Sequence, residues 1–431
     1  MKTPAKWSVI ALAFINFIVQ AQSKFTPPTE FKSGYKLPIN QLVLPRAEWW
    51  QFADIAALVI ALVLTGLFTL KFRSRRGIFF TMLASLAYFG FLRQGCVCPV
   101  GSIQNIALVV GNNAYTLPIL VSVFFALPLI FSLFAGRSFC AGVCPLGAMQ
   151  DVVLIKPLRI PLWLDSALNT IPFIVLAIGG ALAFTGTAFL ICQFDPFVGF
   201  FRFSAPFDMM LISGGVLLIS TVIGRPYCRF FCPYSALLRI TAPLSKWRVS
   251  VTPDKCIKCR LCENSCPFNA IIPPSPEYSK SDVINSRRRV IAFIALLPVL
   301  IISGIFAGRA AGPALSRLDV RVRTAEMMWQ KSNGLAGDTL ETQAFEAQSG
   351  DVNELYKDAE TVKNKITVAV MYACGFIALV IGLKLIGYNM LRKNDSYLAH
   401  PSDCFACGRC YQYCPVRGDG SVADGHVPDN L

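Results

Sequence analysis

The sequence predicts an all-α polytopic membrane protein of about seven transmembrane helices, joined to a small cysteine-rich lobe. Of the 431 residues, 54% are apolar and only 15% are charged, and the mean hydropathy is +0.54. This balance is typical of a chain that lies largely in lipid. The chain also contains 16 cysteines, most of them in short-spaced clusters, which indicates metal binding rather than a disulfide framework.

The N-terminal residues have the pattern of a targeting segment. Residues 1–21 combine Lys2 and Lys6 with a short apolar core and small residues near Ala21, which favours a secretory signal peptide; the alternative is a retained N-terminal anchor. Residues 22–50 are polar and rich in proline, so we expect an external arm. This arm ends at Trp49 and Trp50, aromatic residues of the kind that lie at membrane interfaces.

Apolar runs of membrane-spanning length predict helices near 52–71, 77–93, 116–135, 168–190, 209–224, 290–307 and 366–387. Lys and Arg concentrate in 71–76, 136–161 and 225–289, and such basic flanks mark the cytoplasmic side. Seven spans with the N-terminus outside satisfy all of these flanks. We therefore predict a multi-pass protein of the inner (cytoplasmic) membrane, whose formal charge of +15 follows from its flanks rather than from nucleic-acid binding.

This topology divides the chain into consecutive parts. After the signal peptide and the arm, we expect a membrane domain at 51–245, the first half of the lobe at 246–286, and a transmembrane helix at 287–307. An external helical insertion at 308–365 and a transmembrane helix at 366–390 follow. The second half of the lobe is expected at 391–416, and a disordered tail at 417–431.

Two cysteine runs share the spacing C-x2-C-x2-C-x3-C-P. They are Cys256, Cys259, Cys262, Cys266 and Cys404, Cys407, Cys410, Cys414. Thiolates at these intervals wrap a [4Fe–4S] cluster, and in two-cluster ferredoxins the fourth cysteine of each run ligates the other cluster. We therefore expect Cys414 to complete the first cluster and Cys266 the second. A pair of zinc knuckles is the alternative, which the doubled run without histidine disfavours. The lobe is thus predicted to be a cytoplasmic, ferredoxin-like carrier of two [4Fe–4S] clusters.

A second pattern, Cys-Pro before a small-residue turn and an apolar helix, occurs at 95–108, 139–154 and 227–240. The second and third copies contain C-x3-C-P after a Gly-Arg pair. Their four thiols are candidate ligands of a third, iron–sulfur centre: Cys140, Cys144, Cys228 and Cys232. Alternatively, these turns only shape re-entrant segments that support the lobe. A disulfide is disfavoured because the cytoplasm is reducing.

The first copy carries Cys96 and Cys98, which the topology assigns to the external face together with Cys192. Metal binding, a disulfide and free thiols all stay open for these three residues. Cys374 lies inside the last predicted helix, where packing is its expected role; the alternative is that it joins the three external thiols as a fourth ligand.

Several classes of cofactor and activity are excluded by missing residues. The histidines are His400 and His426, outside every predicted membrane helix, so paired axial ligands for a b-type haem are lacking, and there is no C-x-x-C-H for covalent haem. There is no G-x-G-x-x-G and no Walker loop. Asp54 and Asp195 lie near predicted helix ends, and a proton or sodium pump is therefore not indicated.

The segments FCAGVCPLGAMQD and YCRFFCPYSALL, together with the two split runs, resemble the polyferredoxin membrane proteins of the NapH and NosR type. The resemblance covers nearly all of 50–416 and is closest to the membrane and iron–sulfur part of NosR-type proteins. It implies that the eight cysteines of the runs are cluster ligands and that the C-x3-C-P pairs are redox-associated. NosR-type proteins carry an external flavin-binding domain before the first helix. About 30 residues without a flavin-attachment motif stand there in this chain, and a separate flavoprotein subunit could take the place of that domain.

NapH-type proteins are regarded as quinol dehydrogenases, and NosR-type proteins serve nitrous oxide reductase as electron donors or in maturation. The resemblance therefore implies an electron-transfer subunit in the membrane that passes electrons between a quinol or a cytoplasmic donor and a periplasmic redox partner, and leaves open whether it is itself an oxidoreductase. The alternative is an assembly or regulatory factor for a periplasmic metalloenzyme such as a nitrous-oxide-reductase-type enzyme. Lys255, Lys258 and Arg260 beside the first run would raise a cluster's potential, steer an acidic carrier, or only anchor the chain.

Overall fold

The computed structural model describes residues 48–95, 98–112, 116–202, 206–251, 256–335, 337–347 and 351–415. The predicted signal peptide, most of the external arm, the predicted tail, Cys96 and His426 lie outside these residues. Within them the protein is mostly helical, and contacts divide it into two compact units. One unit contains 315–364 and the other contains 46–314 and 365–431.

The larger unit begins with a series of helices of varied length. Those before the lobe are α2 (Glu48–Leu70), α3 (Arg75–Ser85), η1 (Leu86–Leu92), α4 (Pro99–Gly111), α5 (Ile119–Ala135), α6 (Ser138–Gly142), α7 (Pro145–Val152), α8 (Leu162–Leu168), α9 (Ile171–Phe184), α10 (Leu190–Gln193), α11 (Pro196–Arg202), α12 (Phe207–Ser220), α13 (Pro226–Phe230), α14 (Pro233–Thr241) and η2 (Ala242–Leu244). The remaining elements of the chain are α15 (Leu261–Asn264), β1 (Ile271–Ile272), α16 (Lys280–Ser316), α17 (Val320–Ser332), α18 (Leu340–Ala347), α19 (Val352–Asn389), β2 (Leu398–Ala399) and α20 (Arg409–Gln412).

Four helical segments are long and apolar enough to cross a membrane. They are Trp49–Leu70, Leu162–Phe184, Lys280–Ser316 and Val352–Asn389. Pro99–Gly111, Ile119–Ala135 and Phe207–Ser220 are apolar but shorter. Each of the seven ranges predicted as a span contains helix, so the membrane character is confirmed, whereas the number of spans stays a prediction.

The three Cys-Pro repeats fold in the same way at their helix starts. Cys98, Cys144 and Cys232 are the N-cap residues of α4, α7 and α14, and a proline occupies the first helical position each time. Proline is favoured there because its fixed φ suits the helix and its missing N–H would have no intrahelical partner. The repeated sequence pattern therefore places a cysteine at the N-terminus of a helix in each copy.

The chain between η1 and α4 bends more sharply than the sequence predicts. The α3 helix continues as a π-helical turn, and Gln94 and Gly95 then adopt left-handed conformations, with φ of 51° and 63°. Because of this turn, the thiol of Cys98 lies within electrostatic reach of Cys144 and packs against the same core. The prediction assigned Cys98 and Cys144 to opposite faces of the membrane, and that assignment stays a prediction.

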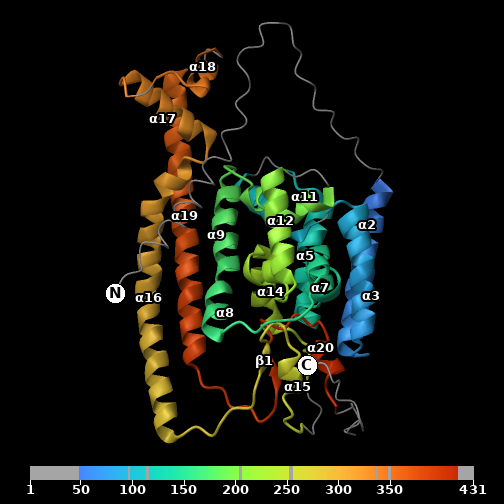
Figure 1. Ribbon diagram of the computed structural model, residues 1–431. Coiled ribbons are helices and arrows are strands. Elements are labelled where there is room, and N and C mark those ends of the chain that lie inside the picture. The colour runs from blue at the N-terminus through green and yellow to red at the C-terminus, as the bar shows by residue number, and fades with distance from the viewer. Residues whose placement is uncertain are drawn as a thin grey trace. The chain divides into compact units, whose positions relative to one another are not determined.

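Long helices α16 and α19 lie side by side in the larger unit (Figure 1), with small residues at their contact. A Cβ added at Gly308 of α16 would lie 2.7 Å from Cα of Met371, and one at Gly312 would lie 2.8 Å from Cα of Thr367. Such close backbone approach is typical of small-residue seams between membrane helices. Cys374 packs at this seam, against Gly304 and Gly308.

The smaller unit contains α17 and α18, which ion pairs hold together. Asp319 caps α17 by accepting a hydrogen bond from the main-chain N–H of Arg321 at 2.9 Å. Arg323 then pairs with Glu341 of α18 at 2.7 Å, and Lys331 pairs with Glu346 at 2.7 Å. The residues predicted as a helical insertion are thus helical where the structure describes them.

The two cysteine runs meet in one lobe, where β1, α15 and α20 lie together at one end of the helices (Figure 1). The antiparallel strands β1 and β2 pair Ile271 with Ala399 and Ile272 with Leu398. Both runs also follow the same local path, because the residues two and four positions after the first cysteine are left-handed in each. These are Lys258, Arg260, Ala406 and Gly408, with φ between 55° and 74°. The two halves of the lobe are therefore repeats of each other.

Candidate iron–sulfur centres

The eight lobe cysteines gather in two sets, each of which takes its fourth member from the opposite run. Around Cys262, the thiols that interact electrostatically are Cys259, Cys414 and Cys256; we call these four residues the first lobe site. The second lobe site is formed by Cys266, Cys404, Cys407 and Cys410, because Cys410 interacts with the other three. This arrangement is the exchange that two-cluster ferredoxins show.

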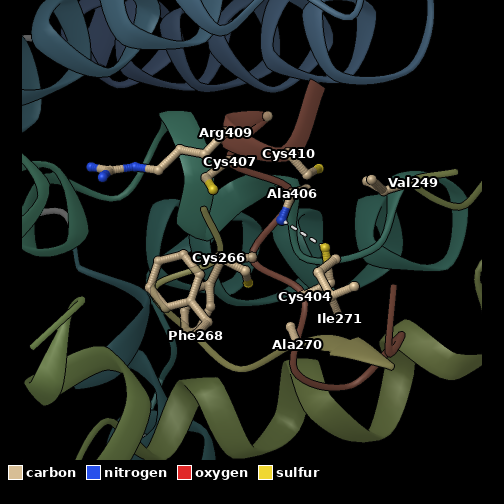
Figure 2. A pocket seen from close by; sticks show the side chains of 12 residues that line it. Val249, Cys266, Phe268, Ala270, Ile271, Cys404, Ala406, Cys407, Arg409 and Cys410 are labelled. Carbon is tan, nitrogen blue, oxygen red and sulfur yellow. Dashed lines mark hydrogen bonds between the residues drawn. The ribbon is translucent and has the colours of Figure 1, made fainter. Parts of the chain in front are cut away.

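The four thiols of the second lobe site surround a common space. They line a small cavity together with Phe268, Ala270 and Ile271 (Figure 2). The main-chain N–H of Ala406 donates to Sγ of Cys404 at 3.4 Å. Amide donors of this kind stabilise cluster sulfurs and ligand thiolates.

Burial keeps these thiols from ionising by themselves. It raises the pKa of Cys404 to about 12 and that of Cys262 to about 11, and it also raises the pKa of Cys266. A thiolate in such a place requires a metal cation to balance it. In the described part of the chain, no three His, Cys, Asp or Glu side chains meet closely enough to hold a single ion. The thiolates of a cubane each bind a different iron, so they need only surround a shared space.

A third group of thiols lies in the core of the larger unit. It contains Cys140, Cys144, Cys228 and Cys232, all buried, and we call it the repeat-thiol site. Cys228 interacts electrostatically with Cys144, Cys232 and Cys140. The four cysteines that the sequence singled out are therefore brought together. Their N-cap positions add helix N–H groups that favour a thiolate.

Two glutamines that the sequence reasoning missed support these thiols. Gln150 donates to Sγ of Cys228 at 3.3 Å and accepts from the main-chain N–H of Tyr227 at 3.0 Å. Gln104 occupies the same position of the first Cys-Pro repeat, six residues after the N-cap cysteine, and accepts from the main-chain N–H of Cys192 at 3.0 Å. Alignment of the repeats would have found both residues. Cys192 itself touches Gly101, the third residue of α4, where an added Cβ would lie 3.1 Å from its sulfur.

Buried arginines join the repeats to the lobe. Arg137 donates to the carbonyl of Ser402 at 2.9 Å, and its guanidinium lies 3.9 Å from the ring of Phe405. Arg229 donates to the carbonyl of Phe268 at 2.8 Å and pairs with Asp165 at 2.7 Å. Arg137 belongs to one of the two Gly-Arg pairs that precede the C-x3-C-P motifs, and no role could be assigned to it from the sequence. The structure shows that it docks the cysteine-rich segments of the lobe.

Asp151 of α7 is the acceptor for three guanidinium groups. It lies 2.5 Å from Arg75, 3.1 Å from Arg409 and 3.5 Å from Arg225. Burial by itself would raise the pKa of Asp151, but the three positive charges outweigh it and hold this pKa well below its usual value. The carboxylate therefore stays ionised and ties together α3, α7, α13 and the second cysteine run.

Asp403, next to Cys404, is held in the same way. Burial opposes its ionisation, but a contact of 2.9 Å from Nδ1 of His400 and the nearby charge of Arg239 keep its pKa well below the usual range. The second lobe site is thus bordered by fixed charges on both sides.

Comparison with known proteins supports iron–sulfur binding. A family model described as a 4Fe-4S binding domain matches residues 117–159 and 205–252, and a second model with the same description matches 249–272. The first match contains the four repeat thiols and the second contains the first cysteine run. The [4Fe–4S] chemistry expected from the lobe is confirmed at the level of these domains, without a count of clusters.

Proteins of similar sequence include a putative electron transport protein and a regulatory protein. The chain is similar to the uncharacterized protein MJ0750 of Methanocaldococcus jannaschii (29% identity, 42% of this chain, 77% of that protein) and to the putative electron transport protein YccM of Escherichia coli (27%, 39% and 52%). It is also similar to the regulatory protein NosR of Pseudomonas aeruginosa (28%, 32% and 21%). The chain thus spans about half the length of YccM and a fifth of NosR. No solved structure matches it. The chain belongs to the polyferredoxin-type membrane proteins with 4Fe-4S binding domains, the group that includes the NosR-type proteins.

Proposed function

We propose that the protein is a membrane-bound iron–sulfur electron-transfer subunit that passes electrons between a quinol or a cytoplasmic donor and a periplasmic redox partner. The observation that carries this proposal is that three sets of cysteines, the two lobe sites and the repeat-thiol site, follow one another in the folded chain. One cluster of buried residues contains Cys407 of the second lobe site together with Cys140 and Cys228 of the repeat-thiol site. [4Fe–4S] clusters supply one-electron oxidation and reduction when bound.

The residues around these sites hold the cofactors and exclude water. In our proposal the first lobe site and the second lobe site each hold one [4Fe–4S] cluster. The repeat-thiol site holds a third iron–sulfur centre. The support for this third centre is the burial of its four thiols and their mutual contact. An electron would then pass from the lobe into the membrane part without leaving the protein.

The proposed topology has seven spans, with the lobe on the cytoplasmic side of the inner membrane. The basic residues of the flanks support it. In this topology the insertion at 308–365 and the arm at 22–50 lie outside, where a periplasmic redox protein or a flavoprotein subunit would dock. The ion-paired helices α17 and α18 give such a partner a folded surface.

A cavity of about 870 Å³ beside the lobe supports a quinol as the donor. Its apolar wall includes Phe173 of α9 and Leu385 of α19, and its polar end includes Lys384, Thr170 and Asp403. An apolar wall opposite a group of polar and charged side chains fits a lipid-soluble carrier whose ring carries oxygen atoms. Asp403 precedes Cys404, so a ring bound here would lie close to the second lobe site.

The alternative is an assembly or regulatory factor for a periplasmic metalloenzyme, which the similarity to the regulatory protein NosR favours. One experiment separates the two. The purified protein is reduced with dithionite, and its visible absorbance is followed after a short-chain quinone is added. Reoxidation within seconds supports electron transfer. Clusters that stay reduced with quinone and with a soluble acceptor would support the assembly role.

A further inference from the structure

Arg225 occupies an unusual backbone position between the lobe and the repeats. Its φ and ψ are 48° and 57°, in the left-handed region that residues other than glycine seldom adopt. Gly224 before it packs so closely on the lobe that an added Cβ would lie 2.9 Å from Cβ of Pro267, the residue after Cys266. Such strain persists only where surrounding contacts hold it in place.

The guanidinium of Arg225 is fully buried and binds the segment that carries Cys140 and Cys144. It donates to the carbonyl of Cys140, and to the carbonyl of Ala141 at 3.2 Å. Its Nε has no hydrogen-bond partner among the described residues. The side chain therefore holds α6 in place, while its Nε–H donates to no acceptor among the described residues.

The charge of Arg225 faces thiols of two different sites. Beyond Asp151, the groups that interact with it most strongly are Cys228, Cys407 and Cys140. Cys228 and Cys140 belong to the repeat-thiol site, and Cys407 belongs to the second lobe site. The ring of Phe405 lies 5.9 Å from the guanidinium and 4.6 Å, centroid to centroid, from the ring of Phe268. Arg225 and this ring pair thus occupy the space between the two sites.

The local charge balance leaves this cation available to the thiols. Asp151 is its nearest carboxylate, but Asp151 already contacts Arg75 at 2.5 Å and Arg409 at 3.1 Å. Three guanidinium groups therefore share one carboxylate. An iron–sulfur cluster with four thiolates is an anion, and it becomes more negative when it is reduced. A buried cation beside it favours the reduced state and raises the reduction potential.

We propose that Arg225 is a positioning residue shared by two iron–sulfur centres, one at the second lobe site and one at the repeat-thiol site, and that its charge raises the reduction potential of both. This inference rests on the third centre of the proposed function. Because one cation lies beside both sites, loss of its charge should lower both potentials together. The thiols of the first lobe site are not among the groups that interact most strongly with Arg225, so its potential should change least.

The test is a redox titration of the purified full-length protein, followed by EPR, with iron and sulfide measured on each sample. Arg225→Met removes the charge and keeps much of the length, and Arg225→Lys keeps the charge. We expect Arg225→Met to lower the potentials of two of three signals and Arg225→Lys to restore most of that shift. Arg93→Met is the matched control: Arg93 pairs with Asp54 at 2.5 Å, and we expect all three potentials to stay unchanged.

A shift of one signal only, or of none, would overturn the inference and leave the electron-transfer proposal intact. A wild-type protein with two clusters would also overturn it, whereas one without clusters would overturn the proposed function itself. If both Arg225 variants lose their clusters, Asp151→Asn decides the question. This variant keeps Arg225 and every thiol but removes a neighbouring negative charge, so both potentials should rise; unchanged potentials would contradict the shared role.

Discussion

At the scale of single residues, the fourth cysteine of each run decides which site it completes. Cys414 lies with the first run and Cys266 with the second, so each lobe site depends on both ends of the lobe. A thiol whose neighbours are other thiols has a different role from one that packs against glycine. Cys374 is of the second kind, since it contacts Gly304 and Gly308.

We expect Cys259→Ala to remove one [4Fe–4S] signal, because it deletes a ligand of the first lobe site. Cys374→Ala should leave every signal in place. EPR of the dithionite-reduced proteins, with iron quantitation, measures both effects. An unchanged cluster content in Cys259→Ala would refute its assignment as a ligand.

Gln150→Leu should weaken the repeat-thiol site and destabilise the fold. It leaves the main-chain N–H of Tyr227 buried without its acceptor, which costs about 1–3 kcal/mol. It also removes the hydrogen bond to Sγ of Cys228, so the spectrum of the third centre should change. Thermal unfolding and EPR measure these effects. Gln104→Leu removes the equivalent bond to Cys192 and should lower stability similarly while leaving the spectra unaltered; a spectral change there would contradict this separation.

At the scale of elements, close packing rather than polar contact joins α16 to α19. The seam of Gly304, Gly308 and Gly312 lets the two backbones approach, and nothing larger than hydrogen fits at these positions. The two helices also connect the halves of the lobe along the chain. Their spacing therefore affects how the two cysteine runs meet.

Gly308→Ala should lower the thermal stability of the purified protein in detergent. Its Cβ would lie 2.7 Å from Cα of Met371 and 2.8 Å from the carbonyl oxygen of Val370, and such overpacking costs about 1–3 kcal/mol. Gly214→Ala in α12 is the control, because its Cβ would meet no atom within 4 Å. We expect that control to be neutral or slightly stabilising, since alanine favours helix. Equal effects of the two substitutions would argue against a packed seam.

At the scale of the whole molecule, Asp151 ties the lobe to the membrane part through its three arginines. Because its pKa is held below the usual value in the folded protein, its stabilising effect is present at neutral pH and is lost as the pH falls below the ordinary range for aspartate. Asp151→Asn should cost about 3–5 kcal/mol at neutral pH and should flatten the acid side of the stability curve. Unfolding measured between pH 7 and pH 3 tests this, and an unchanged acid limb would contradict it.

The iron content of the whole protein tests the number of centres. Three [4Fe–4S] clusters would give about twelve iron atoms for each chain, and two would give about eight. We expect the higher number in anaerobically purified protein, with a loss of about four in a Cys144→Ala, Cys228→Ala double variant. A count of eight that does not change in this variant would show that the repeat thiols hold no cluster.

Local patterns in the sequence were sufficient for the helices and for the grouping of the lobe thiols. The spacing of each run and the apolar runs are local, so Cys256–Cys266 and α16 follow from the sequence alone. The bend at Gln94 and Gly95 depends on two left-handed residues, of which one is not glycine, and no sequence rule identifies it. The contacts of Arg225 and Gln150 join segments about 80 residues apart, so only the folded chain could show what they touch.

The shared use of both runs has a consequence for how the protein is made. Neither lobe site has four thiols until Cys410 has been synthesised, and by then the whole of α16 and α19 has been synthesised as well. Cofactor insertion must therefore be a late step of biogenesis. Ribosomal stalling or a premature stop codon before that point would leave two incomplete sites rather than one finished cluster.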